Sequence, residues 1–143
     1  MSAAEFDPNR LNFEEGLERI RRAVDEAGLE REELQRRIIT SRDDVAVELR
    51  KSLATENIPE GFQKWQLPVY LACESQMFVT IGDPGVKVPR HSHEDGDGIR
   101  FIAGGSIIYE GRELTAGDWM FIPAGEPYSF EVGPNGAIMC YCY

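Results

Sequence analysis

The two histidines of the chain, His91 and His93, are separated by a single residue. In an extended strand alternate side chains point to the same face, so both imidazoles would lie together and could bind one ion. Imidazole is a frequent ligand of transition metals. The alternative is a pair of surface histidines at the end of a strand, and the surrounding residues decide between the two.

Glycines and carboxylates flank this pair at defined distances. Gly85 precedes His91 by five intervening residues. Three residues separate His93 from Asp97, and six residues separate Asp97 from Gly104. If four residues are counted after His93 instead, the next position is Gly98, and six further residues separate it from Gly105, so both registers end on a glycine. A second glycine- and proline-containing pattern follows, with Gly117, Pro123 and Gly125, and Tyr128 three residues later.

Together these two patterns resemble the two motifs of the cupin superfamily, in which a glutamate follows the histidine pair and a third histidine ends the second motif. The resemblance implies a mainly β fold, a double-stranded β-helix (cupin or jelly-roll barrel). It also implies a metal site. In this chain Tyr128 stands at the place of the third histidine, and the position of the glutamate is taken by Asp97 in one register and by Gly98 in the other.

The first register predicts a metal site of His91, His93 and Asp97. Two imidazoles and one carboxylate are the ligand set of non-haem iron(II) sites, so Fe(II) is the favoured cofactor, with Mn, Ni or Zn as alternatives. Tyr128 would then act as a catalytic or positioning group, or have its hydroxyl satisfied by a neighbour at the barrel mouth. In the second register the carboxylate position is empty and Arg100 turns inward.

Further residues are candidates for a substrate pocket. Trp119 shares a face with Phe121, and Phe130 shares one with Tyr128. Aromatic side chains in a small barrel belong more often to the core, but a mouth formed by Tyr128, Phe130 and Arg100 would suit a small carboxylate or aromatic substrate. Arg100 would recognise an anion only in the register that turns it inward.

Composition excludes several classes of partner. The chain carries 15 Lys and Arg against 25 Asp and Glu, a formal net charge of −10. No basic stripe is available to neutralise phosphates, so we expect no nucleic acid partner. No apolar run approaches the roughly 18 residues of a membrane-spanning helix, and the first ten residues do not resemble a signal peptide. We therefore expect a cytoplasmic protein without a membrane partner.

The cysteines do not form a disulfide pattern. Cys73, Cys140 and Cys142 are odd in number and have no C-x-x-C spacing. Cys140 and Cys142 share a face of the last predicted strand, where we expect them to be small buried apolar side chains.

Residues 1–60 are predicted to form an N-terminal helical segment, and residues 61–143 the cupin barrel. After a mobile tail over the first ten residues, Asn12 is expected to cap a helix that ends at Gly28. A shorter helix is predicted over 30–38, and a third between Ser41 and Asn57. Strands are predicted over 68–81 with an interruption around 74–76, around the histidine pair and over 99–103, 106–109, 112–114, 119–122, 128–132 and 137–143, with a turn at 134–136.

These features predict a small metal-binding enzyme that acts on a small organic substrate by oxygenase-, isomerase- or lyase-type chemistry. The alternative is a non-catalytic cupin that binds or senses a small molecule and has a degenerate metal site. A homodimer built partly from the helical segment is also expected, because cupins are often oligomeric.

Overall fold

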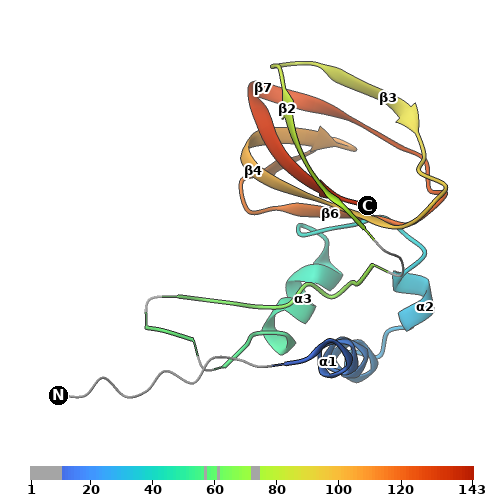
Figure 1. Cartoon of the computed structure of the whole chain (residues 1–143), viewed down its shortest axis with the longest axis vertical. Coiled ribbons are helices and arrows are strands. Elements are labelled where there is room, and N and C mark those ends of the chain that lie inside the picture. The colour runs from blue at the N-terminus through green and yellow to red at the C-terminus, as the bar shows by residue number, and fades with distance from the viewer. Residues whose placement is uncertain (1–10, 57, 61, 72–74) are drawn as a thin grey trace. The chain divides into compact units, whose positions relative to one another are not determined.

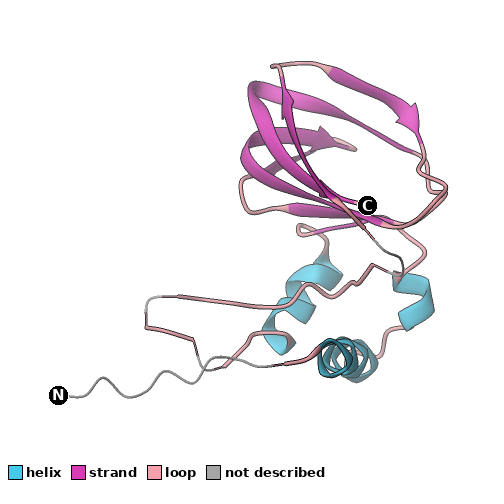
Figure 2. Ribbon diagram, viewed as in Figure 1, coloured by secondary structure: helices cyan, strands magenta, loops and turns pink. Residues whose placement is uncertain are grey.

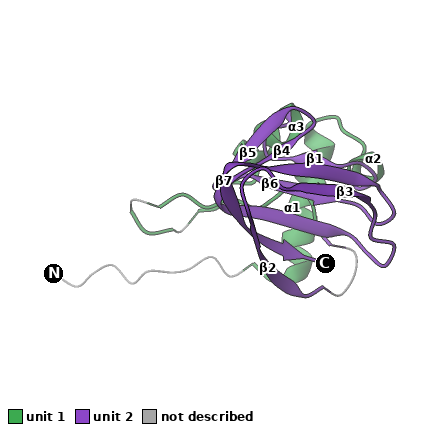
Figure 3. Ribbon diagram, turned by 90° about the horizontal axis from the view of Figure 1, so that it is seen from above, with its two compact units in different colours: residues 1–34, 44–70 green, residues 35–43, 71–143 purple. Residues whose placement is uncertain are grey.

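The structure is a computed structural model that describes residues 11–56, 58–60, 62–71 and 75–143. Cys73 and the tail predicted for the first ten residues lie outside the described residues. The chain divides into two compact units (Figure 3): a helical unit, Met1–Leu34 and Asp44–Tyr70, and a β unit, Gln35–Asp43 and Leu71–Tyr143. The division predicted at residue 60 thus falls before the end of the helical unit, and a segment of the predicted helical region belongs to the β unit.

Helix α1 (Phe13–Glu26) begins at the residue that the sequence predicts. The side chain of Asn12 accepts a hydrogen bond from the backbone N–H of Glu15 at 2.9 Å, which satisfies one of the free donors of the first turn. Gly28, just past the helix end, has a φ of 73°, the left-handed conformation that commonly follows a helix. α1 buries the face that carries Ile20, Ala23 and Val24.

The second predicted helix is shorter than expected. Only α2 (Arg31–Leu34) is helical, because Ile39 and Thr40 form a two-residue strand, β1 (Ile39–Thr40), that pairs with β6. Helix α3 (Asp44–Ser52) follows directly. In the helical unit an antiparallel bridge joins Ala54 to Trp65 after α3.

The β unit is built from one antiparallel sheet with the strand order β1-β6-β4-β7-β2, in which β3 also pairs with β7 and β5 with β4 (Figures 1 and 2). The strands after β1 are β2 (Met77–Gly82), β3 (Lys87–His91), β4 (Gly98–Tyr109), β5 (Arg112–Thr115), β6 (Trp119–Ile122) and β7 (Tyr128–Cys142). Of the strands predicted over 68–81, the part after the interruption forms β2, and no strand forms among the described residues before it. The inner face of the sheet carries the core cluster, which includes Ile102, Leu114, Met120, Phe130 and Met139.

β7 runs through the segment where a hairpin turn was predicted, and that prediction is wrong. Val132 pairs with Ile107 and Ala137 with Gly105, so the four residues between them on β7 face a single residue of β4. Pro134, which has no N–H for a ladder, lies in this bulge. A side chain at Gly105 would collide with the carbonyl oxygen of Gly136, which explains the glycine at this close approach.

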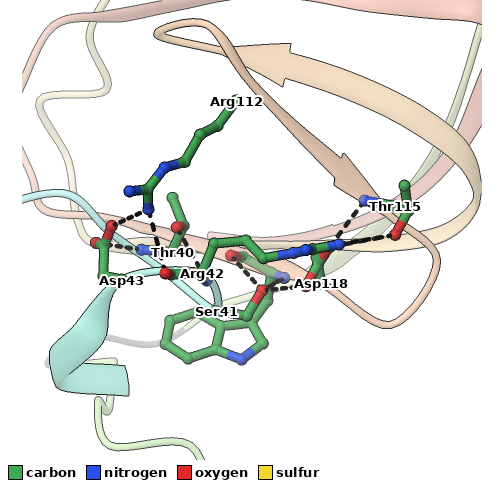
Figure 4. Close-up of polar contacts among 8 residues, drawn as sticks. Thr40, Ser41, Arg42, Asp43, Arg112, Thr115 and Asp118 are labelled. Atoms are coloured by element: carbon green, nitrogen blue, oxygen red, sulfur yellow. Dashed lines mark hydrogen bonds and ion pairs between the residues drawn. The ribbon is translucent and has the colours of Figure 1, made fainter. Parts of the chain in front are cut away.

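A network of polar side chains fastens the segment around β1 to the strands beside it (Figure 4). The carboxylate of Asp118 accepts hydrogen bonds from Ser41 Oγ at 2.7 Å, from Arg42 Nε at 2.9 Å and from the backbone N–H of Thr115 at 2.9 Å. Burial alone would raise the pKa of Asp118, but the bonds from Ser41, Thr115 and Arg42 outweigh it and hold the pKa below its ordinary value. Asp118 therefore acts as an ionised anchor for β1.

Within the described part of the chain, no helix combines the length and the apolar character needed to span a membrane.

Candidate functional site

The two histidines lie together at the end of β3. His91 is the last residue of this strand and pairs with Tyr128 on β7. His93 follows in the loop, and the two imidazole rings are 5.1 Å apart between centroids in an edge-on arrangement. The predicted clustering of the pair on one side of the chain is thus present in the structure.

A backbone carbonyl fixes the protonation of His91. Its Nδ1 lies 2.7 Å from the carbonyl oxygen of Pro89. Because a carbonyl oxygen only accepts, Nδ1 must carry the proton and donate it. Nε2 is left as the nitrogen of His91 that can accept a hydrogen bond or bind a ligand.

Tyr128 links His93 to a buried arginine. Its hydroxyl accepts a hydrogen bond from Arg100 Nη2 at 3.2 Å and lies 3.4 Å from His93 Nε2. With the guanidinium donating to it, the phenol can direct its own proton toward the imidazole. Burial lowers the pKa of His93, and the charges of His91 and Arg100 lower it further, so His93 favours the neutral form.

Arg100 is a buried cation, with 7% of its surface exposed. Its guanidinium carbon lies 4.1 Å from the ring centroid of Tyr141 and 4.9 Å from that of Phe130. Apart from Tyr128, its only hydrogen-bond acceptor among the described residues is the sulfur of Met139, at 3.7 Å. Within the same residues no carboxylate pairs with Arg100, and its Nε has no partner. The positive charge is therefore stabilised mainly by aromatic faces.

The pairing of β4 selects one of the two registers left open by the sequence. Arg100 pairs with Met120 on β6 and with Tyr141 on β7. Its side chain is buried on the same face of β4 as Gly98 and Ile102. Gly98 is therefore the residue at the carboxylate position of the inner face. A Cβ at Gly98 would lie 2.5 Å from the Tyr141 hydroxyl, so the phenol fills the space where a longer side chain would project.

Asp97 is held by a different part of the chain. One oxygen of its carboxylate accepts a hydrogen bond from the backbone N–H of Ala124 at 3.0 Å, in the turn that follows β6. Among the described residues there is no group of three or more His, Cys, Asp and Glu side chains that could hold a metal ion. The structure brings His91, His93 and Tyr128 together but does not add Asp97 to them.

Tyr141 was not predicted as a site residue. It is 3% exposed, and within the described part of the chain its hydroxyl has no hydrogen-bond partner. Burial is the main cause that raises the pKa of Tyr141, and the neighbouring Tyr128 raises this pKa further. The signal for it was the alternation of the last strand, because the face opposite Cys140 and Cys142 is the one that turns inward.

Aromatic rings continue the site beyond His93. Its imidazole is 4.8 Å from the ring of Tyr143 and 5.5 Å from that of Tyr141, measured between centroids. Tyr143 in turn stacks on Phe78 at 5.1 Å and is 41% exposed. The cluster therefore extends from the buried guanidinium to the surface of the β unit.

The predicted pocket residues separate into two groups. Phe130 lies beside Arg100 on the inner face. Trp119 pairs with Phe101, one residue out of phase with Arg100, and so lies on the opposite face of the sheet. The structure does not bring Trp119 to the histidines.

Comparisons with solved structures give several matches. KdgF from Halomonas sp. is 22% identical with a TM-score of 0.44, over 48% of this chain and 67% of that one. A cupin protein from Bacteroides fragilis is 27% identical with a TM-score of 0.41, over 49% of this chain and 64% of that one. The complex of Rhodobacter sphaeroides SigE with the anti-sigma ChrR matches 96% of this chain and 70% of the other, at 17% identity and a TM-score of 0.44. No family model matches the chain, and neither does any curated protein.

The two sequence motifs occupy adjoining strands of the β unit. The histidine motif spans β3 and the start of β4, the second motif spans β6 and the start of β7, and β4 pairs with both β6 and β7. The β unit is a mainly antiparallel sheet, and solved cupin proteins are among the structures to which it is similar. The two cupin-like motifs of the sequence meet on the inner face of this sheet, where the resemblance would place a metal site.

The residues at this position of the cupin do not fit a divalent cation. The donors beside the histidines are imidazoles and phenols, and the carboxylate position is glycine. A guanidinium lies beside them, hydrogen-bonded to Tyr128, and its positive charge would repel a metal ion. The site of His91, His93 and Asp97 with Fe(II) stays a prediction that this arrangement of side chains does not support.

Proposed function

We propose that this cupin binds a small organic anion, with Arg100 as the residue that recognises the negative charge. The supporting observation is a buried guanidinium that has no carboxylate partner and an unsatisfied Nε among the described residues. An isolated buried charge is costly, and a carboxylate ligand would supply both the opposite charge and the planar acceptor pair that a guanidinium matches.

The neighbours of Arg100 define the class of anion. Tyr141 provides a hydroxyl donor, which has no hydrogen-bond partner within the described residues. Phe130, Tyr143 and Phe78 provide aromatic surface. A small carboxylate with an apolar or aromatic body would satisfy both sets of groups. This corresponds to the binding or sensing function that the sequence left as the alternative.

A second candidate is an enzyme that moves a proton on the bound anion. It is favoured by one contact, the Tyr128 hydroxyl between Arg100 Nη2 and His93 Nε2. A phenol activated by a guanidinium and paired with a neutral imidazole is a general acid and base arrangement that needs no metal. Turnover of a carboxylate that stops in Tyr128→Phe, while binding persists, would favour the enzyme over the binding protein.

The first test of the proposal is ligand stabilisation. We expect a set of small carboxylates to contain members that raise the free energy of unfolding, by about 2.7 kcal/mol at 100 times the dissociation constant. The matching primary amides should give no stabilisation. Arg100→Met should abolish the effect, while Arg90→Met, which removes an exposed arginine of β3, should preserve it.

Arg100→Met also has an expected effect without ligand. Because it replaces an unpaired buried cation by an apolar side chain of similar length, the free protein should be as stable as the wild type or more stable. Carboxylates that stabilise wild type and Arg100→Met equally would contradict the proposal.

A further inference from the structure

A groove lies along the exposed side of α3, between this helix and the segment that follows it. On the helix, Val47 is followed at three and four residues by Arg50 and Lys51, the spacing that places side chains on one face. The residues that line the groove come from both elements and include Val47, Arg50, Lys51, Ala54, Lys64 and Trp65. We call this hollow the α3 groove. Its volume is about 450 Å³, and it lies wholly within the helical unit (Figure 3).

Hydrogen bonds hold the second wall of the groove in place. The backbone N–H of Thr55 donates to the carbonyl oxygen of Lys64 at 2.9 Å, so the chain after α3 folds back on itself as a short antiparallel ribbon. Arg19 of α1 fastens this ribbon by donating to Gln66 Oε1 at 2.7 Å and to the carbonyl oxygen of Ala54 at 2.9 Å. The groove is therefore formed before a ligand binds, which lowers the entropic cost of binding.

An arginine and a tryptophan connect the two walls. The guanidinium carbon of Arg50 lies 3.7 Å from the ring centroid of Trp65. Trp65 still keeps 36% of its surface exposed, and Val47 keeps 52%. Tryptophan and arginine are among the residue types that most often dominate the binding energy of protein interfaces, and stacking holds this pair in one arrangement.

The charged residues that line the groove are all cations. They are Arg50, Lys51 and Lys64, in a chain with 25 acidic and 15 basic residues. Arg50 and Lys51 lie in the last turn of α3, where cations also complement the helix dipole, but Lys64 comes from the ribbon. Within the described residues no carboxylate forms an ion pair with any of the three. Since charges are screened beyond about 8 Å at physiological salt, this local cluster decides which sign of charge the groove attracts.

A second hollow adjoins the α3 groove. Its volume is about 350 Å³, and it shares Thr55, Lys64 and Trp65 with the groove. Leu17 and Ile20 of α1 are among the apolar side chains that line it. The ribbon is thus flanked by two apolar compartments, and Lys64 contacts both.

We propose that these two hollows bind an acidic peptide segment of another protein. Its apolar side chains would enter the hollows, and its carboxylates would pair with Arg50, Lys51 and Lys64. A small molecule fits less well, because small-ligand sites bury about 70–90% of the ligand surface and the floor of this groove is open. A peptide covers that floor itself and can place an apolar anchor in each compartment. This site differs in position and in ligand from the anion site proposed at Arg100.

The test is the selection of peptides from a random display library on the full chain, followed by titration of the recovered peptides. We expect these peptides to be enriched in Asp and Glu next to Leu, Ile or Phe. In Trp119→Phe the remaining tryptophan is Trp65, and each peptide should shift its emission to shorter wavelength as it covers the ring. Added salt should weaken the binding, because exposed charge pairs are screened.

Charge reversals locate the binding surface. Lys51→Glu and Lys64→Glu should each weaken peptide binding about 10-fold or more, because they place like charges against the peptide. Both side chains are exposed, so the fold should persist, which circular dichroism would verify. Arg22→Glu is the matched control, since Arg22 is an exposed cation of α1 that lines neither hollow, and it should bind like the wild type. Arg100→Met should also bind the peptides unchanged, so a failure of the proposed carboxylate site and a failure of this site give different results.

Three outcomes would overturn the proposal. The first is the recovery of no peptide, or of peptides without an excess of acidic residues. The second is equal binding to the wild type, Lys51→Glu and Lys64→Glu, because the peptides would then use another surface. The third is a dimer of the free chain that Lys64→Glu dissociates, which would assign the groove to a second copy.

Discussion

Arg100 reverses the electrostatics of the cupin inner face. The motif of the family places a carboxylate among imidazoles, which attracts a cation. Here Gly98 occupies the carboxylate position, and the Tyr141 phenol fills the space of the missing side chain. The guanidinium of Arg100 is buried two residues further along β4, on the same face. The proposed site is therefore expected to attract an anion, whereas the motif of the family would attract a cation.

The metal content of the purified protein follows from the donor set. Because no carboxylate, thiol or third imidazole joins His91 and His93 among the described residues and a guanidinium is close, we expect far less than one equivalent of Fe, Mn, Ni or Zn per chain. Elemental mass spectrometry of protein prepared without chelator or nickel affinity measures this. Near-stoichiometric metal that disappears in His91→Ala would restore the metal site predicted from the sequence.

His93 gives a prediction about pH. Its pKa is lower in the folded protein than the ordinary value of 6.5, so the unfolded chain binds the proton more readily. The free energy of unfolding should therefore be highest above this value and should fall as the pH drops from it toward the folded pKa. Denaturant unfolding at several pH values should show this slope, and His93→Gln should reduce it. An identical slope in both proteins would contradict the assignment.

The residue types of the site could be predicted from the sequence, but not which residues of β4 point to the inner face of the sheet. His91 and His93 were found from their spacing, and Tyr128 from its place in the second motif that resembles the cupin family. Gly98 and Asp97 both satisfied the motif, and only the long-range pairing of β4 with β6 and β7 determines which one faces inward. Tyr141 was missed for the same reason, since its role depends on a glycine far away in the sequence.

At the scale of elements, β1 shows the limit of local patterns. Ile38 and Leu34 continue a helical spacing, so the sequence predicted one helix over 30–38. Two residues are too few to predict a strand from local pattern. Ile39 and Thr40 form a strand because they pair with the edge of β6. Helix α1, which has its own cap and apolar face, was predictable because its information is local.

Asp118 provides the test of this element. Asp118→Asn removes the charge that accepts hydrogen bonds from Ser41, Arg42 and Thr115, and it should lower the stability of the β unit by about 1–3 kcal/mol. Urea unfolding would measure the loss, with Glu113→Gln, an exposed change on β5, as a control without effect. Since the pKa of Asp118 is depressed, the contribution should be complete above the ordinary value of 3.8 and disappear as the pH falls through the folded pKa. Equal stability of Asp118→Asn and the control would show that the network does not hold β1.

At the scale of the whole molecule, each unit contains one tryptophan. Trp65 of the helical unit is 36% exposed beneath the guanidinium of Arg50, whereas Trp119 of the β unit is 4% exposed. The helical unit is the smaller of the two, and small units bury a smaller fraction of their surface. We expect it to unfold first.

Single-tryptophan variants would measure the order. Trp119→Phe leaves the reporter in the helical unit, and Trp65→Phe leaves the one in the β unit. The fluorescence transition of Trp119→Phe should occur at the lower urea concentration. Coincident transitions would instead indicate that the whole chain unfolds as one cooperative body.

The origin of β1 also affects how this protein can be cut and recombined. The strand comes from the stretch between two helices of the other unit, so neither unit is a single continuous piece of sequence. A deletion that begins at the N-terminus and ends anywhere past Thr40 removes a strand from the sheet and leaves the edge of β6 open at Phe121. The N-terminal region therefore cannot be exchanged as one independent domain. A shorter version that keeps the fold of the β unit has to retain β1 or replace it.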